Sequence, residues 1–326
     1  MITNIYIKNF KAFQKAEIYP CQLNIFTGLN GMGKSTFLQT LLLLRQSYRQ
    51  NTLLDKGLLL NGDYIEIGKG KDAYSMYGPE DNIITFELEW DEKLELLCKF
   101  QSQDELDLLP INTLKLSNEN VWKQTLFKNN FQYLSAERIS PRTFFPTSPY
   151  HVEQIHSLGN QGEFTIHFIA KNQLKDIPIK ALSYPKTDTL ALLAQIDAWM
   201  GEITPNIHLS SSLYDEFDIA RLSYNFEVNK EKTDEFKPTN VGFGLTYTLP
   251  IVTAILSASP GDLIIIENPE SHIHPRGQAI LGKLFAIAAE NGVQLFIETH
   301  SDHVLNGIRV ATKQKLIGNK SNSSWD

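Results

Sequence analysis

The sequence predicts an α/β fold in which antiparallel strands at the N-terminus precede a mixed or parallel core sheet. Residues 2–9 alternate apolar and polar side chains over most of their length, as a half-buried strand does. An apolar run at 23–27 leads into a glycine-rich turn and then a helix-like run that ends near Arg49. Near the C-terminus, strand-like and helix-like patterns alternate twice, which implies parallel strands joined by right-handed crossovers. These four segments are 262–267, 277–290, 293–298 and 301–315.

The first half contains several shorter patterns. Strand prediction rests on alternation and on β-branched or aromatic side chains, as in the run that ends at Trp90. We expect strands at 16–19, 65–67 and 82–90, a loop or short helix at 51–62 and a polar turn at 69–72. Residues 93–99 either continue the preceding strand or form a helix, and the sequence leaves both open.

The middle of the chain is less regular. Residues 131–142 predict a core strand that ends in a charged loop, and residues 143–180 are expected to form irregular surface. A helical apolar period over 188–200, with Asp188 as its cap and Gly201 as its stop, predicts a helix. The remaining predictions are strands at 207–213 and 220–228, a charged turn at 229–235 and a frayed polar tail from 318.

Length and composition are those of an ordinary globular protein. The 326 residues allow one large domain or two, and 42% hydrophobic and 21% charged residues are typical values. The net charge of −7 argues against a uniformly basic nucleic-acid surface but leaves room for a local basic groove.

The sequence also predicts a cytoplasmic protein with no membrane partner. Cys21 and Cys98 fit no metal-ligand spacing and no disulfide framework, which suits a reducing compartment. The N-terminus lacks a basic segment followed by an apolar core, so we expect no signal peptide. No apolar run approaches the length that spans a bilayer.

The glycine-rich turn carries the clearest chemistry. Residues 28–36 read GLNGMGKST and match the phosphate-binding pattern G-x-x-x-x-G-K-S/T, with a strand before it and a helix after it. Its glycines let successive N–H groups face one anion, and the helix directs its positive end to the same place. Lys34 would reach the β- and γ-phosphates, and the Ser35 hydroxyl would hold Mg²⁺. The expected nucleotide-binding residues of the turn are Asn30, Gly31, Gly33, Lys34, Ser35 and Thr36.

Polar groups in the second half suit the same ligand. Glu267 ends a core strand, where a carboxylate can hold the Mg²⁺ that bridges phosphates. His300 follows the next strand and could donate to a phosphate oxygen, although a packed histidine is the structural alternative. Gly242 and Gly244 precede the helix-like run 247–256 and would form a second anion-binding helix end.

Two residues beside Glu267 are candidates for activating water. An amide such as Asn268 cannot take up a proton at neutral pH, but its carbonyl can orient a water molecule. Glu270 is a carboxylate and could act as a general base.

Four histidines in this region also suggest a zinc site. Because their spacing fits no standard zinc finger and no cysteine lies nearby, we disfavour it. They are His272, His274, His300 and His303.

These segments together resemble a known group of proteins. Their order is NFKAF at 9–13, the glycine turn, YLSAERISPR at 133–142, NVGFG at 240–244, ENPESHIHPRGQ at 267–278 and ETHSDH at 298–303. This order is similar to that of bacterial AAA-type ATPases with ABC-type heads, which are relatives of the RecF, SMC and OLD proteins. The resemblance covers most of the chain.

The resemblance implies an ABC-type P-loop NTPase head that uses ATP and Mg²⁺. Glu267 would be the Walker B acid, a position that is usually Asp. The catalytic glutamate that normally follows is replaced by Asn268, so the resemblance leaves Glu270 as a candidate substitute and implies slow hydrolysis. Gly242 and Gly244 would form the signature loop that contacts ATP bound to the other subunit, although this version departs from Leu-Ser-Gly-Gly-Gln. His300 would be the switch histidine.

The resemblance also implies a domain layout. One ABC-type ATPase domain would span 1–326, with a core lobe at about 1–50 and 240–316, an inserted subdomain at about 51–239 and a tail at 317–326. The early sheet would provide a platform for adenine, and Phe10 and Phe13 belong either to it or to plain core packing.

Partners follow from the resemblance as well. Such ATPases often dimerise head to head around two ATP molecules, and many act beside nucleases or other effectors in anti-phage defence, as the Septu ATPase does. Too few residues follow His300 for the Toprim nuclease of OLD proteins, so we expect any nuclease to be a separate protein. No heptad run predicts SMC-type coiled arms.

The function that these patterns favour is an ATP-driven switch that controls a partner. A scaffold with negligible hydrolysis is one alternative, which Asn268 favours. A RecF-like repair ATPase is another, with DNA as its partner. A transporter subunit is disfavoured.

Overall fold

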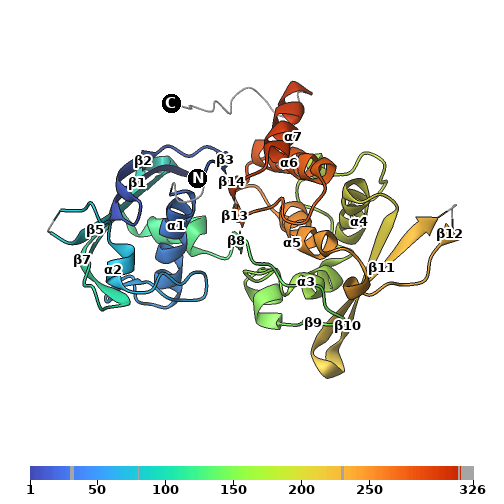
Figure 1. The fold of residues 1–326 in the computed structure, drawn as a ribbon, viewed down its shortest axis with the longest axis horizontal. Coiled ribbons are helices and arrows are strands. Elements are labelled where there is room, and N and C mark those ends of the chain that lie inside the picture. Colours follow the sequence, from blue (N-terminus) through green and yellow to red (C-terminus); the bar gives the residue numbers. More distant parts are fainter. Residues whose placement is uncertain (30–32, 80, 229–230, 315, 317–326) are drawn as a thin grey trace. The chain divides into compact units, whose positions relative to one another are not determined.

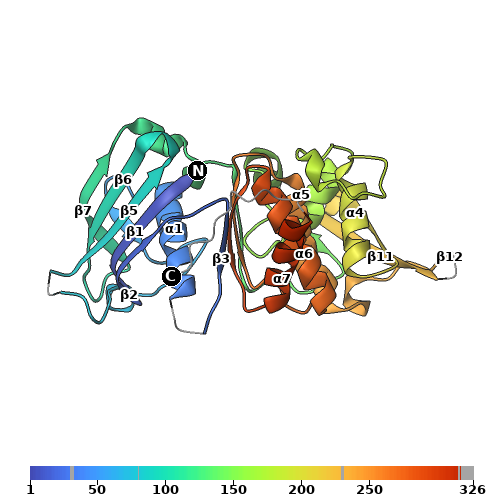
Figure 2. The ribbon, with the colours of Figure 1, turned by 90° about the horizontal axis from the view of Figure 1, so that it is seen from above.

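The computed structural model describes residues 1–29, 33–79, 81–228, 231–314 and 316 (Figures 1 and 2). The chain forms two compact units, Met1–Phe131 and Gln132–Asp326. The boundary at 131 lies inside the predicted insert of 51–239, because strands from 57 to 116 join the sheet of the N-terminal strands. The predicted layout of core lobe and insert is otherwise not tested and stays a prediction.

The first unit is built on a six-stranded sheet with the order β2-β1-β5-β6-β7-β4, in which every neighbouring pair is antiparallel. The strands are β1 (Ile2–Phe10), β2 (Phe13–Ile18), β4 (Gly57–Leu59), β5 (Ile83–Trp90), β6 (Leu94–Gln101) and β7 (Leu108–Leu116). The predicted antiparallel start is confirmed. Phe10 packs edge-on against Phe86 at 5.2 Å between ring centroids, so Phe10 belongs to the core.

Helix α1 (Lys34–Arg49) has the predicted bounds and follows strand β3 (Leu23–Phe26) through the glycine turn. Phe26 and Phe37 stack at 4.6 Å, which joins the strand to the helix on either side of the turn. Arg45 is buried and donates to the carbonyl oxygens of Leu126 (2.6 Å) and Lys128 (2.9 Å). The glycine turn is therefore held between two anchored elements.

Some first-unit predictions were wrong. The predicted loop or short helix at 51–62 contains strand β4, and 65–67 forms only an isolated bridge between Asn61 and Glu66. The predicted turn at 69–72 overlaps a short helix, α2 (Gly70–Ala73). Residues 93–99, for which the sequence left both strand and helix open, lie largely in strand β6. Strand β7 was not predicted, because Pro110 and several half-exposed side chains mask its alternation.

The second unit contains the parallel strands that the sequence predicts. Strands β14 (Gln294–Glu298), β13 (Leu263–Glu267) and β8 (Phe131–Leu134) lie side by side in that order. β13 and β14 are parallel, and their register pairs Leu263 with Gln294 and Glu267 with Glu298. Both strands are almost fully buried, as a parallel strand covered on two faces should be.

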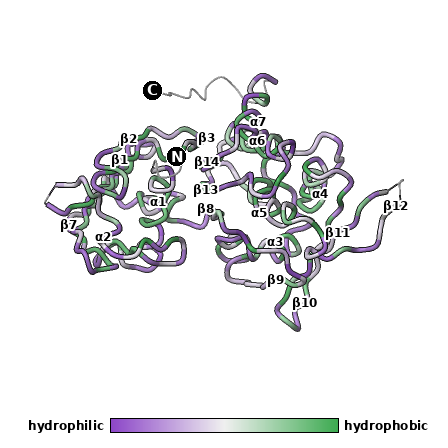
Figure 3. The backbone as a smooth tube through the Cα atoms, in the orientation of Figure 1, coloured by the Kyte–Doolittle hydropathy of each residue, from purple (hydrophilic) through white to green (hydrophobic). Residues whose placement is uncertain are grey.

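Among the described residues of the second unit, five α-helices pack together. They are α3 (Thr165–Asn172), α4 (Leu192–Ile203), α5 (Phe243–Ser257), α6 (Pro275–Glu290) and α7 (Asp302–Lys313). Helix α5 is largely hydrophobic and buried (Figure 3). Helices α6 and α7 approach closely at two glycines. A Cβ atom on Gly307 would lie 2.0 Å from the carbonyl oxygen of Ala279, and one on Gly282 would lie 2.2 Å from that of Val304.

A β-hairpin completes the unit. Strand β10 (Ile207–Tyr214) pairs along its whole length with residues 219–226 of β11 (Ile219–Val228), and β9 (Phe145–Pro146) and β12 (Glu231–Lys232) also pair with β11. Short 3₁₀ or π turns lie at Asp91–Lys93, Glu119–Lys123, Thr125–Phe127, Tyr150–Gln154, Lys180–Leu182, Asp215–Phe217 and Pro238–Asn240.

Two second-unit predictions need correction. Residues 143–180 are not all irregular, since helix α3 buries Ile166 and Ile169. Eight residues are too few for a helical period to stand out from the polar sequence around them. Helix α4 begins at Leu192 and runs past Gly201, so Asp188 is not its cap. Among the described residues, every helix falls short of the length and apolar character that crossing a bilayer requires.

The α6–α7 crossing predicts that Gly307→Ala destabilises the protein. The added methyl group has no room against the Ala279 carbonyl, so the helices must separate. We expect the free energy of unfolding to fall by about 1–3 kcal/mol in denaturant titrations. Arg309→Ala on an exposed position of the same helix is the control, and an equal change in both variants would contradict the packing argument.

Candidate functional site

The glycine turn of the first unit has the geometry of an anion-binding loop. Gly28 and Gly33 have positive φ angles of 135° and 89°, which favour glycine. Gly33 is the N-cap of α1 and offers no side chain to the first N–H groups of the helix. An anion would be stabilised at this end of α1, because the helix dipole is positive there. The predicted residues Asn30 and Gly31 lie outside the described residues.

Lys34 places its ammonium group at this turn. Its Nζ donates to the carbonyl oxygens of Gly28 (2.9 Å) and Leu29 (2.8 Å), so the side chain folds back along the loop. Ser35 is exposed, as a metal-binding hydroxyl should be, whereas Thr36 is 6% exposed. The turn thus brings together Gly33, Lys34 and Ser35. Because the Thr36 side chain is buried, Thr36 would contribute its backbone N–H to the site.

Phe13 lies against the same turn. A Cβ atom on Gly33 would lie 3.0 Å from the Phe13 ring, so this position is tight as well as left-handed. Phe13 is half-buried, whereas Phe10 is fully buried. Of the two aromatic residues that the sequence left open, only Phe13 is placed beside the predicted phosphate-binding loop.

In the second unit, Glu267 ends strand β13 and is held by two donors. The Tyr133 hydroxyl donates to its Oε1 at 3.1 Å, and the Ala136 N–H donates to its Oε2 at 3.2 Å. Burial, and then the nearby charge of Glu298, raise the pKa of the Glu267 carboxyl group, while both donors and Arg138 oppose that rise. A divalent cation would relieve this unfavourable negative charge, so the site fits Mg²⁺ chemically.

Arg138 fixes the backbone at the end of this strand. Its guanidinium group donates to the carbonyl oxygens of Glu267 and, at 3.1 Å, of Asn268. Burial lowers the pKa of Arg138 to about 10, so the group stays charged at neutral pH. Asn268 has a positive φ of 43°, a conformation that asparagine tolerates better than most residues. Arg138 therefore positions the two residues that the sequence assigns to metal binding and water activation.

The two candidates for water activation differ in their surroundings. Glu270 accepts from the Thr299 hydroxyl at 2.6 Å and from the His300 N–H at 2.7 Å, one bond to each oxygen. Within the part of the chain that the structure describes, the Asn268 side-chain amide has no hydrogen-bond partner. This geometry makes Glu270 a positioning residue for the 299–300 turn and leaves the Asn268 amide available to a water molecule.

The histidines fall into different roles. His300 is exposed directly after β14, where its ring is accessible to a ligand. His274 is the N-cap of α6 and accepts from the Arg276 N–H at 3.3 Å. His272 packs against Tyr247 at 4.9 Å between ring centroids. Among the described residues, no group of three or more His, Cys, Asp or Glu side chains gathers as metal ligands would.

The second glycine turn opens helix α5. Gly242 is exposed and forms the N-cap, and Phe243 beside it is 53% exposed. A Cβ atom on Gly244 would lie 2.3 Å from the carbonyl oxygen of His272, so Gly244 allows the turn to pack against the 268–274 loop. Thr246 is buried and cannot act as the signature serine.

Sequence reasoning assigned no role to Tyr133 or Arg138, although the segment 133–142 carried part of the resemblance. The sequence signal that could have identified Arg138 is a basic residue shortly after a core strand. Gln132, in strand β8, donates to the carbonyl oxygens of Tyr133 (2.7 Å) and Gly159 (3.0 Å) and accepts from the Leu158 N–H. Its amide is therefore used to hold the backbone.

Comparisons with known proteins agree with this fold. A family described as "AAA domain, putative AbiEii toxin, Type IV TA system" matches residues 101–306, more than half of the chain. A Helicobacter pylori protein named "ATP/GTP phosphatase" is 25% identical over 341 residues, which cover 97% of this chain and 89% of that protein.

Two solved structures share the architecture. One is the SmcHead bound to the C-winged helix domain of ScpA, with a TM-score of 0.54. The other is a Smc head domain with an extended coiled coil bound to the C-terminal domain of ScpA, derived from Pyrococcus furiosus, with a TM-score of 0.55. Each is 11% identical, and each alignment covers 94% of this chain and 91% of the other. The chain thus has the ABC-type ATPase fold of SMC heads, as the sequence predicted.

The environment of Glu267 predicts that Glu267→Gln stabilises the protein at neutral and alkaline pH. A folded-state pKa above the ordinary 4.5 means that stability falls as pH rises through the interval between the two values. The neutral amide removes this penalty and can still accept from Ala136 while donating to the Tyr133 oxygen. Without Mg²⁺, the melting temperature of the variant relative to wild type should be higher at about pH 8 than at about pH 5.

Glu290→Gln, at the exposed end of α6, is the matched control. A Glu267→Gln difference that does not depend on pH, or that equals the control, would contradict the desolvation argument.

Proposed function

Because the chain belongs to this AAA-domain family, we propose that it is a Mg²⁺-dependent ATPase that acts as a molecular switch. The observation that carries the proposal is the glycine turn, where the positive start of helix α1, the Lys34 ammonium and an exposed Ser35 share one loop. The name of the Helicobacter pylori relative supports nucleotide hydrolysis as the reaction class.

On this proposal, Lys34 and the N–H groups of α1 bind the β- and γ-phosphates of ATP. Ser35 and Glu267 would hold Mg²⁺, which would neutralise charge on the phosphate oxygens. Phe13 offers a ring beside the loop for the adenine base. His300 donates to the γ-phosphate, and the Glu270 contact with its backbone N–H sets its position.

On this proposal, Asn268 is the residue that activates water. Its amide oxygen orients the attacking water, but it cannot accept the proton, so the γ-phosphate or bulk water takes it up. Slow hydrolysis follows, since a general base contributes typically about 10²–10⁴-fold to a rate. A slow ATPase suits a switch that remains in its ATP-bound state until a partner acts.

The switch itself is a homodimer in our proposal. The turn at Gly242 and Gly244 of one copy contacts the γ-phosphate bound to the other copy, and exposed Phe243 lies at the contact. Closure and reopening would move the middle of the chain against a separate effector, for which a nuclease in anti-phage defence is the leading candidate. The resemblance to defence ATPases supports this part.

Two alternatives remain, each with an observation in its favour. The Asn268 substitution favours a nucleotide-binding scaffold with negligible turnover. The SMC-like fold favours a DNA-associated ATPase of the RecF kind, which predicts ATP-dependent DNA binding with steep salt dependence. Single-turnover hydrolysis and DNA binding across a salt series separate all three.

Lys34→Ala should abolish ATP binding and hydrolysis, because the ammonium is the only phosphate ligand in the turn that carries a full positive charge among its described residues. Equilibrium binding of a fluorescent ATP analogue and release of phosphate are the two measurements. Lys56→Ala, an exposed lysine of the same unit, should leave both unchanged. Wild-type turnover in Lys34→Ala would refute the ATPase assignment.

Asn268→Ala and Glu270→Gln should have different effects. Asn268→Ala should slow single-turnover hydrolysis about tenfold with little change in ATP affinity, since it removes one oriented hydrogen bond to water. Glu270→Gln keeps its shape and should change the affinity for ATP more than the chemical step. A larger loss of rate in Glu270→Gln, with affinity unchanged, would move the role of base to Glu270.

A further inference from the structure

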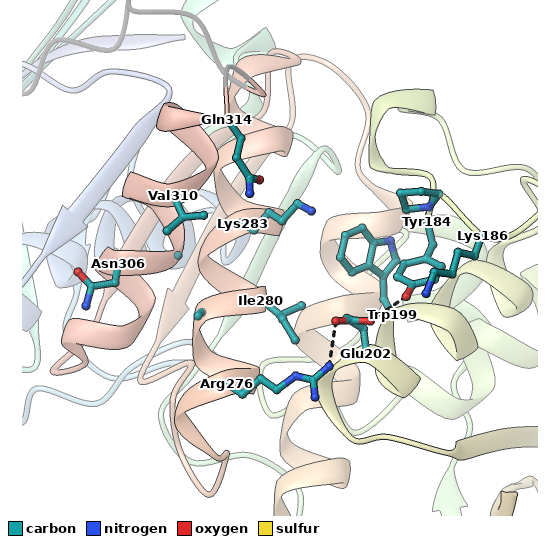
Figure 4. Close-up of a pocket in the computed structure, with 13 residues that line it drawn as sticks. Tyr184, Lys186, Trp199, Glu202, Arg276, Ile280, Lys283, Asn306, Val310 and Gln314 are labelled. Atoms are coloured by element: carbon teal, nitrogen blue, oxygen red, sulfur yellow. Dashed lines mark hydrogen bonds and ion pairs between the residues drawn. The ribbon is translucent and has the colours of Figure 1, made fainter.

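A groove on the second unit has no role in the proposed ATPase. It has a volume of about 530 Å³ and lies between helices α6 and α7 on one side and α4 with the 184–186 segment on the other (Figure 4). All the residues that line it belong to the second unit.

The floor of the groove is apolar and fixed. The Trp199 indole is 3% exposed and donates its N–H to the carbonyl oxygen of Leu182 at 2.8 Å. Ile280 on α6 and Val310 on α7 add aliphatic surface, and Val310 is 51% exposed. A half-exposed valine and a tryptophan fixed by its hydrogen bond both line the groove and contribute a preformed surface for apolar side chains.

The rim of the groove is basic. Arg276 pairs with Glu202 at 3.1 Å, and the Tyr184 hydroxyl donates to Glu202 at 2.7 Å, so the one acidic side chain of the lining is neutralised. Lys283 lies 5.8 Å from the centroid of the Trp199 ring, and Lys186 is exposed. The lining therefore has an excess of two positive charges in a chain whose net charge is −7.

The groove is lined by two helical stripes. On α7 the lining positions Asn306, Val310 and Gln314 are four residues apart. On α6 the positions Arg276, Ile280 and Lys283 are four and three apart, and Figure 4 shows both rows along their helices. Such stripes form an elongated trough, which suits a helical segment better than a compact small molecule.

We propose that this groove docks an acidic amphipathic helix of a partner protein. Apolar side chains at helical spacing contact Ile280, Val310 and the Trp199 ring, and Asp or Glu side chains of the partner meet Lys186 and Lys283. The charge excess decides between occupants, because a locally basic lining attracts an acidic segment although the net charge of the chain is −7. The proposal rests on the groove and not on ATP turnover.

A partner docked in this groove would also affect the candidate site. Helix α6 begins directly after the 268–274 loop, and α7 begins directly after Ser301, which follows His300. The two helices pack closely at Gly282 and Gly307. A partner bound across both helices would bias the position of the loops that carry Asn268 and His300.

The test selects peptides and then removes the charges. A random 12-residue peptide library is displayed on phage and selected against the immobilised full chain, and the selected peptides are measured by fluorescence anisotropy. We expect them to carry Asp or Glu together with apolar residues at helical spacing. Lys186→Glu/Lys283→Glu should weaken their binding about tenfold or more, the equivalent of about 1.4 kcal/mol.

Controls separate this result from a general charge effect. Lys128→Glu/Lys175→Glu makes the same charge change at exposed positions outside the groove and should bind as wild type does. Lys186→Glu alone leaves the Lys283–Trp199 contact intact and should still weaken binding. Val310→Asn tests the apolar floor without a change of charge and should also weaken it. Thermal melting confirms that each variant is folded.

Several outcomes overturn the proposal. Selection of basic peptides, no selection, or equal loss in the Lys128/Lys175 control would each do so. A labelled DNA duplex that binds wild type and is lost in Lys186→Glu/Lys283→Glu, when no peptide binds, would assign the groove to DNA. A change of oligomeric state in that variant by light scattering would assign it to a second copy. Because none of these measurements requires ATP, their failure is distinct from failure of the ATPase proposal.

Discussion

The parallel pairing of β13 with β14 is the constraint on which the candidate site of the second unit depends. Its register places Glu267 opposite Glu298, so both strands deliver an acid to the same sheet edge. Burial, and then the repulsion between these acids, raises the pKa of the Glu267 carboxyl group. A protein keeps such an arrangement at a cost in stability, which a bound cation offsets.

Two further contacts convert this edge into an organised site. Arg138 holds the carbonyl oxygens of Glu267 and Asn268, and Glu270 holds Thr299 and the His300 backbone. The first contact fixes the end of β13, and the second ties the loop after β13 to the turn after β14. The side chains proposed for metal binding, water orientation and γ-phosphate contact therefore have a common framework.

The same loops lead directly into α6 and α7, which are two of the helices that line the groove. The two glycines at the helix crossing allow a close approach, and Gly307 and Ala279 at this crossing are themselves part of the groove lining. The surface proposed to bind an acidic partner is thus formed by the helices that follow the site loops. On this proposal, partner binding and ATP hydrolysis influence each other through these helices and not through long loops.

The sequence by itself determined the elements whose signals are local. The glycine turn with Lys34 and Ser35, the bounds of α1, and the two buried strands near the C-terminus were all predicted from spacing and periodicity, and the structure confirms the elements. Strand β7 and helix α3 were missed, because Pro110 and a short polar-flanked helix hide the periods that such predictions need.

Only the tertiary structure decided what depends on contacts between distant residues. It separated Glu270, whose oxygens are both engaged, from Asn268, and it gave Arg138 and Tyr133 their roles at Glu267. It placed Phe10 in the core and Phe13 beside Gly33, which the sequence left open. Hydrogen bonds, burial and charge neighbours arise from the packing of segments more than a hundred residues apart, so no local pattern encodes them.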